Sequence, residues 1–154
     1  MDGLQREIGK RKPFDLPEEE AYLNLLRTQS ALASQCERLF RREGLSGSGY
    51  NILRILRGAA PAPRCPREIA DQLVAAVPDM TRLLDRLEDQ GLVSRERSVE
   101  DRRMVLVRLT AKGQKVLASL DEPLRELHRA QLGHLSREDL RELSRLLVLA
   151  RRGG

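Results

Sequence analysis

A single β-hairpin pattern interrupts a sequence whose other apolar residues recur at helical spacing. Residues 93–97 and 104–109 read as two short strands, and in the second strand Val105, Val107 and Leu109 alternate onto one face. The polar residues between the two strands predict the hairpin loop. Because helical stripes precede and follow the hairpin, we expect a mainly α fold with one small β-hairpin.

The order of the expected helices narrows the fold further. Two long segments flank the hairpin region, at 16–42 on one side and at 111–132 on the other, and a last helix is expected at 136–151. Between residue 42 and the hairpin lie three shorter helical segments, at about 48–57, 66–74 and 78–90. Three short helices followed by a hairpin predict a winged helix-turn-helix with an appended helical region.

Helix boundaries follow from particular residues. Gly91 is expected to end the third short helix in a left-handed conformation, and Gly58 to end the first. Thr110 and Ser136 are typical N-caps for the last two helices. Pro123 falls inside the 111–132 segment, where we expect it to kink or restart the helix.

The long helices carry apolar stripes without an obvious partner in so small a chain. We therefore expect residues 1–15 to be a polar tail and residues 16–154 to be one domain. In this domain, helices 16–42, 111–132 and 136–151 would pair with a second chain, and residues 48–109 would form the winged-helix lobe. The stripe residues expected at the dimer interface are Tyr22, Leu25, Leu140, Leu143 and Leu147.

Composition excludes several classes of protein. The chain has 154 residues, a net charge of +5 and 3% aromatic residues, so a reader of single strands that stacks bases on aromatic rings is disfavoured. No apolar run has the length of a membrane span, and the first residues contain no signal-peptide core. The two cysteines form no disulfide framework, so we expect a cytoplasmic protein with no membrane partner.

Residues 81–113 contain three short motifs in a fixed order. The sequence LEDQGLV occupies 87–93, DRR occupies 101–103, and LTAKG occupies 109–113. In this order and spacing they resemble the MarR family of bacterial transcriptional regulators, and the element order extends the resemblance over about 17–150. The resemblance implies a homodimer that binds pseudo-palindromic double-stranded DNA, usually as a repressor. It also implies that a small aromatic or lipophilic effector, or oxidation, often releases the DNA.

The expected DNA contacts come from the third short helix and from the hairpin. With its apolar face inward, this helix presents Asp79, Thr81, Arg82 and Arg86 to the major groove. Thr81 can contact a thymine methyl or a phosphate, Arg82 a guanine and Arg86 a phosphate. The expected wing contacts, for the minor groove and its phosphates, are Arg95, Arg97, Asp101, Arg102 and Arg103.

The resemblance assigns the minor-groove insertion to Arg103, with Arg102 as the alternate, and gives Asp101 the role of orienting an arginine. The net charge of this segment does not by itself indicate DNA binding, since residues 65–109 hold eight Arg against nine Asp and Glu. The alternative is a solvated face in which the arginines pair with nearby acids. A winged-helix protein-interaction module would dimerise without binding DNA and would tolerate neutralisation of Arg102 and Arg103.

No pattern of an enzyme or a metal site stands out. The glycines at 44 and 49 have P-loop spacing, but Tyr50 and Asn51 follow where a P-loop needs Lys and Ser or Thr. His128 and His134 lie six residues apart with no cysteine pair nearby, so we expect no metal and no cofactor.

The two cysteines leave a redox-sensing regulator open as an alternative. Cys36 lies in the apolar stripe of the first long helix, which favours a buried small hydrophobe. Cys65 lies in a proline-rich loop where exposure is expected, and a reactive thiol there would need a lowered pKa.

Overall fold

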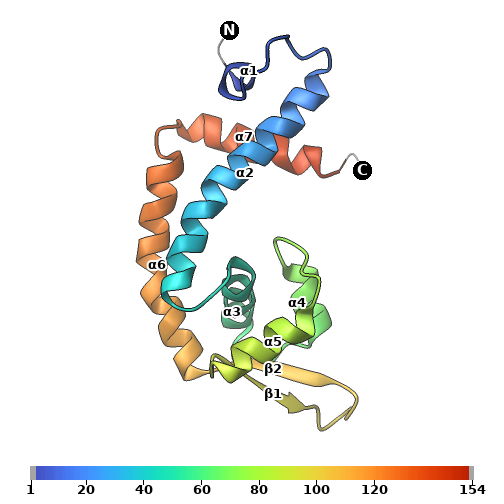
Figure 1. Ribbon diagram of the computed structural model, residues 1–154. Helices are drawn as coiled ribbons and strands as arrows, with labels where there is room; N and C mark the ends of the chain where they lie inside the picture. The colour runs from blue at the N-terminus through green and yellow to red at the C-terminus, as the bar shows by residue number, and fades with distance from the viewer. Residues whose placement is uncertain (1–2, 153–154) are drawn as a thin grey trace.

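The computed structural model describes residues 3–152 and has two parts (Figure 1). Three helices and a hairpin gather at one end, while the long helices extend away from them toward the two termini. The elements are α1 (Leu4–Glu7), α2 (Pro17–Arg42), α3 (Gly47–Ala59), α4 (Pro66–Gln72), α5 (Met80–Asp89), β1 (Val93–Arg97), β2 (Val105–Leu109), α6 (Ala111–Leu132) and α7 (Arg137–Ala150). The predicted mainly α fold with a hairpin wing is confirmed.

The hairpin forms where the alternating pattern predicted it. β1 and β2 are antiparallel, with Val93 opposite Leu109 and Arg97 opposite Val105. Val107 also exchanges backbone hydrogen bonds with Arg64, in the loop before α4, at 2.8 and 3.0 Å. These bonds attach the hairpin to the helical part of the lobe.

The core of the lobe joins every one of its elements to α6. Its most deeply buried residues have at most 2% of their surface exposed, and full burial of each aliphatic side chain stabilises the fold by roughly 1.5–3 kcal/mol. The deepest are Ile52, Leu53 and Leu56 from α3, Ile69 from α4, Leu84 from α5, Val93 and Val107 from the hairpin, and Leu117 and Leu120 from α6. Because α6 contributes two of these residues, the lobe is fixed to the helix that leads toward the C-terminus.

Local signals set the ends of the helices. Gly91 follows α5 with φ 71°, the left-handed conformation that its position predicted. The Thr110 hydroxyl accepts a hydrogen bond from the Gly113 amide at 3.0 Å, and the Ser136 hydroxyl accepts one from the Asp139 amide at 3.0 Å. Gly113 is required for a different reason, because a Cβ at this position would overlap the carbonyl oxygen of Leu92.

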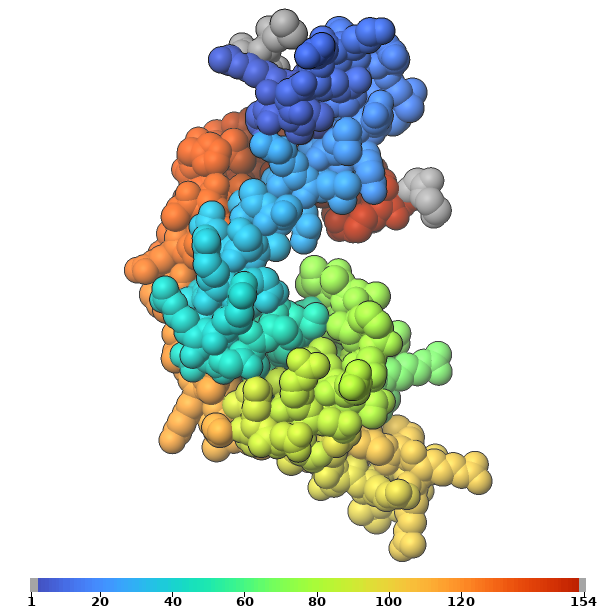
Figure 2. Space-filling model, viewed as in Figure 1, coloured from blue at the N-terminus to red at the C-terminus, as the bar shows by residue number. Residues whose placement is uncertain are grey.

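The apolar stripe of α2 divides into two halves. Near the C-terminal end of the helix, Leu39 and Phe40 pack on the core of the lobe. Near its N-terminal end, Tyr22 and Leu25 are 61% and 42% exposed. In α7 no residue is buried, and Leu143 is 39% exposed. Figure 2 shows the N-terminal half of α2 standing clear of the lobe, so the lobe does not cover this apolar surface.

Three sequence predictions need correction. The expected tail contains α1, in which Leu4 is buried and Glu7 forms an ion pair with Arg27 at 2.7 Å; residues 1–2 lie outside the described residues. α3 does not end at Gly58 but continues to Ala59. α6 passes through Pro123 without restarting, because Leu120 and Leu124 on either side pack into one core and the proline ring lies on an exposed face. Within the described residues no helix has the length and apolarity needed to cross a membrane.

Candidate nucleic-acid interface

Helix α5 has one face in the core and one face in solvent. Leu84 and Leu87 are 1% and 2% exposed, whereas Thr81, Arg82 and Arg86 lie on the opposite side, away from the core. The predicted outward face is therefore present on a well-anchored helix.

Asp79, the first residue of the predicted set, serves the helix itself. Its carboxylate accepts a hydrogen bond from the Arg82 amide at 2.9 Å and so caps α5. An aspartate in this position satisfies backbone donors rather than a base edge. We accordingly assign Asp79 to positioning the N-terminus of the helix.

The two arginines of α5 keep their donors available. The Arg82 side chain is 82% exposed, and its Nε lies 4.0 Å from the Asp79 carboxylate, at the limit of an ion pair. No carboxylate of residues 3–152 pairs with Arg86. The structure therefore does not support the alternative in which neighbouring acidic residues fully engage the arginines of this helix.

Arg95, predicted as a wing contact with DNA, is engaged by carboxylates of α5. It stands in the middle of β1, where its Nη2 contacts Asp85 Oδ1 and Glu88 Oε2, each at 2.6 Å. Its amide also donates to Glu88 Oε1 at 3.0 Å. Hydrogen bonding to Arg95 lowers the pKa of Glu88, and hydrogen bonding to Glu88 raises the pKa of Arg95. The residue thus joins α5 to the wing.

The wing tip is ordered by its own hydrogen bonds. The Ser98 hydroxyl accepts from the amides of Glu100 and Asp101 at 3.2 and 3.3 Å, and the Asp101 carboxylate accepts from the Arg103 amide at 2.9 Å. Arg97 donates to the Arg102 carbonyl at 3.4 Å. Asp101 thus holds the backbone of Arg103, and its role in orienting an arginine side chain toward DNA stays a prediction.

The hairpin projects beyond α5 at the end of the molecule farthest from the termini (Figure 2). Arg102 and Arg103 are exposed in the loop at its tip, and Arg97 precedes them at the end of β1. The structure thus brings an outward polar helix face and an exposed arginine-bearing loop together on one lobe. This arrangement suits insertion of a helix into a major groove with a hairpin beside it.

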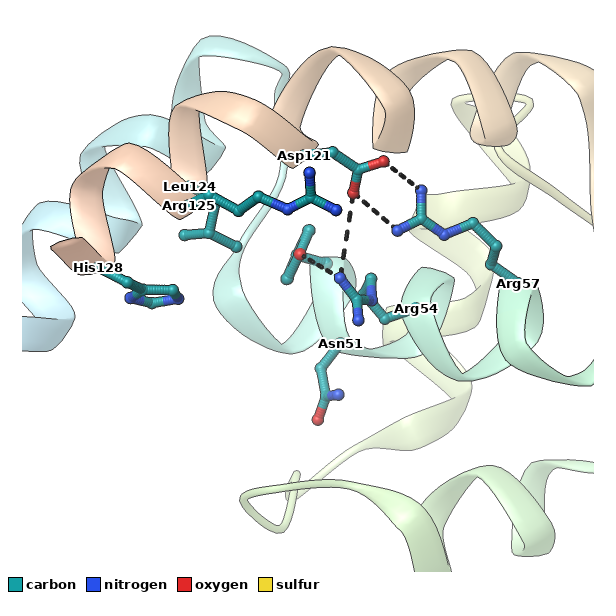
Figure 3. A pocket seen from close by; sticks show the side chains of 8 residues that line it. Asn51, Arg54, Arg57, Asp121, Leu124, Arg125 and His128 are labelled. Atoms are coloured by element: carbon teal, nitrogen blue, oxygen red, sulfur yellow. Dashed lines mark hydrogen bonds and ion pairs between the residues drawn. The ribbon is translucent and has the colours of Figure 1, made fainter. Parts of the chain in front are cut away.

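A separate cavity of about 510 Å³ lies between α3 and α6 (Figure 3). Arg57 of α3 and Asp121 of α6 form a bidentate ion pair across it, at 2.7 and 2.8 Å. Hydrogen bonding to Arg57 holds the pKa of Asp121 below its usual value. The other side chains around the cavity are those of Tyr50, Asn51, Arg54, Leu124, Arg125 and His128.

Comparison with known proteins identifies the family of the chain. The MarR family profile matches residues 45–105. A MarR transcription factor from Planctomyces limnophilus is 47% identical, with a TM-score of 0.69; the match covers 89% of this chain and 99% of that one. The chain belongs to the MarR family.

Two further relatives agree with this membership. The transcriptional regulator FarR of Neisseria gonorrhoeae is 29% identical over 126 residues, which are 82% of this chain and 85% of FarR. A mutant of E. coli MarR, solved in complex with operator DNA, has the same fold at 23% identity and a TM-score of 0.72, over 97% of this chain and 99% of that one. This MarR-family chain is accordingly a DNA-binding transcription regulator and not an enzyme.

Sequence reasoning missed two contacts of this MarR-family lobe. The Asn51 side chain accepts a hydrogen bond from the Val74 amide at 2.9 Å and so holds the loop that leads into α5. The pairing of Arg57 with Asp121 spans 64 residues. No local pattern indicates either contact, because each depends on how two elements pack.

The cysteines give little support to thiol chemistry in this MarR-family member. Cys36 is half-buried beside the core, and burial raises the pKa of its thiol, the opposite of what a reactive cysteine requires. Cys65 precedes α4 and is half-buried, rather than exposed as expected.

Proposed function

We propose that this regulator is a cytoplasmic homodimer. It binds a pseudo-palindromic operator in double-stranded DNA and represses transcription. The observation that carries the proposal is the pairing of an outward polar α5 face with an exposed, arginine-bearing wing on one rigid lobe. Arg95 supports it further, since its bonds to Asp85 and Glu88 fix the helix relative to the wing.

Each outward side chain receives a role from its chemistry. Arg82, near the N-terminus of α5, reads guanine, and Thr81 contacts a thymine methyl or a phosphate. Arg86, one turn later, contacts a phosphate. Arg103 enters the minor groove with Arg102 as its alternate, and the neighbouring Arg97 meets the backbone.

The proposal of a homodimer rests on apolar surface that this chain leaves exposed. Tyr22, Leu25 and Leu143 are exposed, while Leu140 and Leu147 are half-buried on α7. In a monomer such side chains would form an apolar surface rimmed by polar residues, which is typical of an interaction site. We assign α2, α6 and α7 to the dimer and residues 48–109 to DNA. Two lobes would then meet half-sites about 10 bp apart, centre to centre.

We also propose that a small-molecule effector regulates DNA binding from the cavity between α3 and α6. α3 belongs to the lobe, whereas α6 continues into the dimerisation region, so a ligand between them is placed to alter the separation of two lobes. Such control requires the ligand to bind one arrangement of the lobes more tightly than the other.

The test is selection of binding sites from a library of random duplexes, using the full chain. The proposal predicts enrichment of an inverted repeat, and loss of enrichment when Arg102 and Arg103 are both changed to Gln. Arg38→Gln is the matched control, because Arg38 is an arginine of α2, outside the lobe. No enriched sequence, or unchanged enrichment in the double variant, would favour a protein-interaction module instead.

A further inference from the structure

The cavity between α3 and α6 is bordered by more positive than negative side chains. Arg54 and Arg57 reach it from α3 and Arg125 from α6, whereas Asp121 is the one carboxylate among its lining residues. Just outside, Arg129 and Glu122 extend the network. Four guanidinium groups of this network thus face two carboxylates, Asp121 and Glu122.

Two of the arginines keep donors for a further partner. Arg57 directs both of its terminal nitrogens at Asp121 in a bidentate contact. Arg54 is 4.0 Å from the same carboxylate, and its other contact is a 3.3 Å hydrogen bond to the Tyr50 hydroxyl. Arg125 makes one 3.2 Å contact, with Glu122, and its side chain is 68% exposed. A guanidinium carries five N–H donors, so both side chains can bind another acceptor.

The lining of the cavity does not suit a lipophilic ligand. Pockets for such ligands are lined mainly by apolar and aromatic side chains. Here the apolar contribution comes from Tyr50 and from Leu124, which is itself 8% exposed and packs into the core. Figure 3 shows the polar ends of Arg54, Arg57 and Asp121 turned toward one another across the space between the two helices.

We propose that this cavity binds a small dicarboxylate or tricarboxylate through Arg54 and Arg125. Arginine forms charge-assisted, often bidentate hydrogen bonds with carboxylates, and the Arg57–Asp121 pair already shows that geometry at this site. Two uncompensated positive charges match a ligand with at least two negative charges. Because this ligand would join α3 to α6, we also assign it the role of the effector. This second step of the proposal rests on the proposed function.

Calorimetric titration of citrate into the full chain, without DNA, tests the binding step. The expected result is saturable binding that weakens by about tenfold or more in Arg54→Gln and in Arg125→Gln, since each loses charge-assisted hydrogen bonds. Asp121→Asn is expected to tighten binding, because it removes a competing carboxylate and frees Arg57. Arg38→Gln makes the same charge change outside the cavity and is expected to bind citrate as the parent does.

Three outcomes would overturn the binding step: no citrate binding at millimolar concentration, equal affinity in all four variants, or tighter binding of salicylate or inorganic phosphate than of citrate. The effector step is tested on the selected operator. Release of DNA by citrate from the parent, and not from Arg54→Gln, is expected; citrate binding that leaves DNA affinity unchanged overturns it. Absence of DNA binding before citrate is added would refute the proposed function and leave the calorimetric result intact.

Discussion

The ion pair between Arg57 and Asp121 joins the DNA-binding lobe to α6, so its removal has a calculable effect. Asp121→Asn keeps the shape of the side chain but removes its charge. The two side chains are 23% and 31% exposed, which places the pair between surface pairs, at about 0–1 kcal/mol, and buried pairs, at about 3–5 kcal/mol when one partner is lost. We therefore expect the free energy of unfolding to fall by about 2 kcal/mol.

Urea denaturation followed by circular dichroism at pH 7 and fixed protein concentration measures this loss. In a thermal scan it corresponds to a fall in Tm of about 4–8 °C for a chain of this length. Glu142→Gln, which removes an ion pair with Arg145 between side chains that are both more than half exposed, is the control and is expected to change stability little.

The pH dependence provides an independent check. Hydrogen bonding to Arg57 makes the pKa of Asp121 lower in the folded chain than in the unfolded one. The stabilisation is therefore complete above the ordinary aspartate pKa and is lost as pH falls through the lowered folded-state value. The difference between parent and Asp121→Asn should narrow as the pH is lowered from neutral into this acidic range. The reasoning would be refuted if parent and Asp121→Asn were equally stable at neutral pH, or if their difference in stability did not change with pH.

Three more predictions follow from the lobe and the long helices. Arg82→Ala should weaken operator binding by about 1–3 kcal/mol and affect a random duplex little, whereas Arg86→Ala should weaken binding to both, as fluorescence anisotropy can show. Gly113→Ala should destabilise the fold by about 1–3 kcal/mol in urea denaturation, because its Cβ would overlap the Leu92 carbonyl oxygen; wild-type stability would contradict the packing seen here. Leu25→Glu should convert the dimer to a monomer in sedimentation measurements, and an unchanged mass would remove α2 from the interface.

Sequence patterns predicted the parts of the fold that depend on neighbouring residues. The hairpin strands, the left-handed Gly91 and the caps at Thr110 and Ser136 each follow from chemistry within a few positions. The opposite faces of α5 were likewise predictable from helical periodicity.

Contacts between elements could not be predicted in this way. Arg95 looks like any other wing arginine in the sequence, and only the packing of β1 against α5 reveals its two carboxylate partners. Pro123 is a helix breaker by local rules, but the burial of Leu120 and Leu124 on either side favours one continuous helix. The cavity between α3 and α6 was equally unpredictable from local patterns, since its two walls are distant in the chain.

The central claim is that α5 and the wing read DNA sequence through Arg82 and Arg103, while neighbouring arginines contact phosphates. A salt titration of binding to the DNA flanking the protein's own gene, beside a random duplex of equal length, tests it most directly. The account predicts preferential binding to the flanking DNA and a steep fall of affinity with salt, because phosphate contacts release counterions. Absence of binding to either duplex at low salt would contradict it, and equal affinity for both would refute sequence-specific recognition.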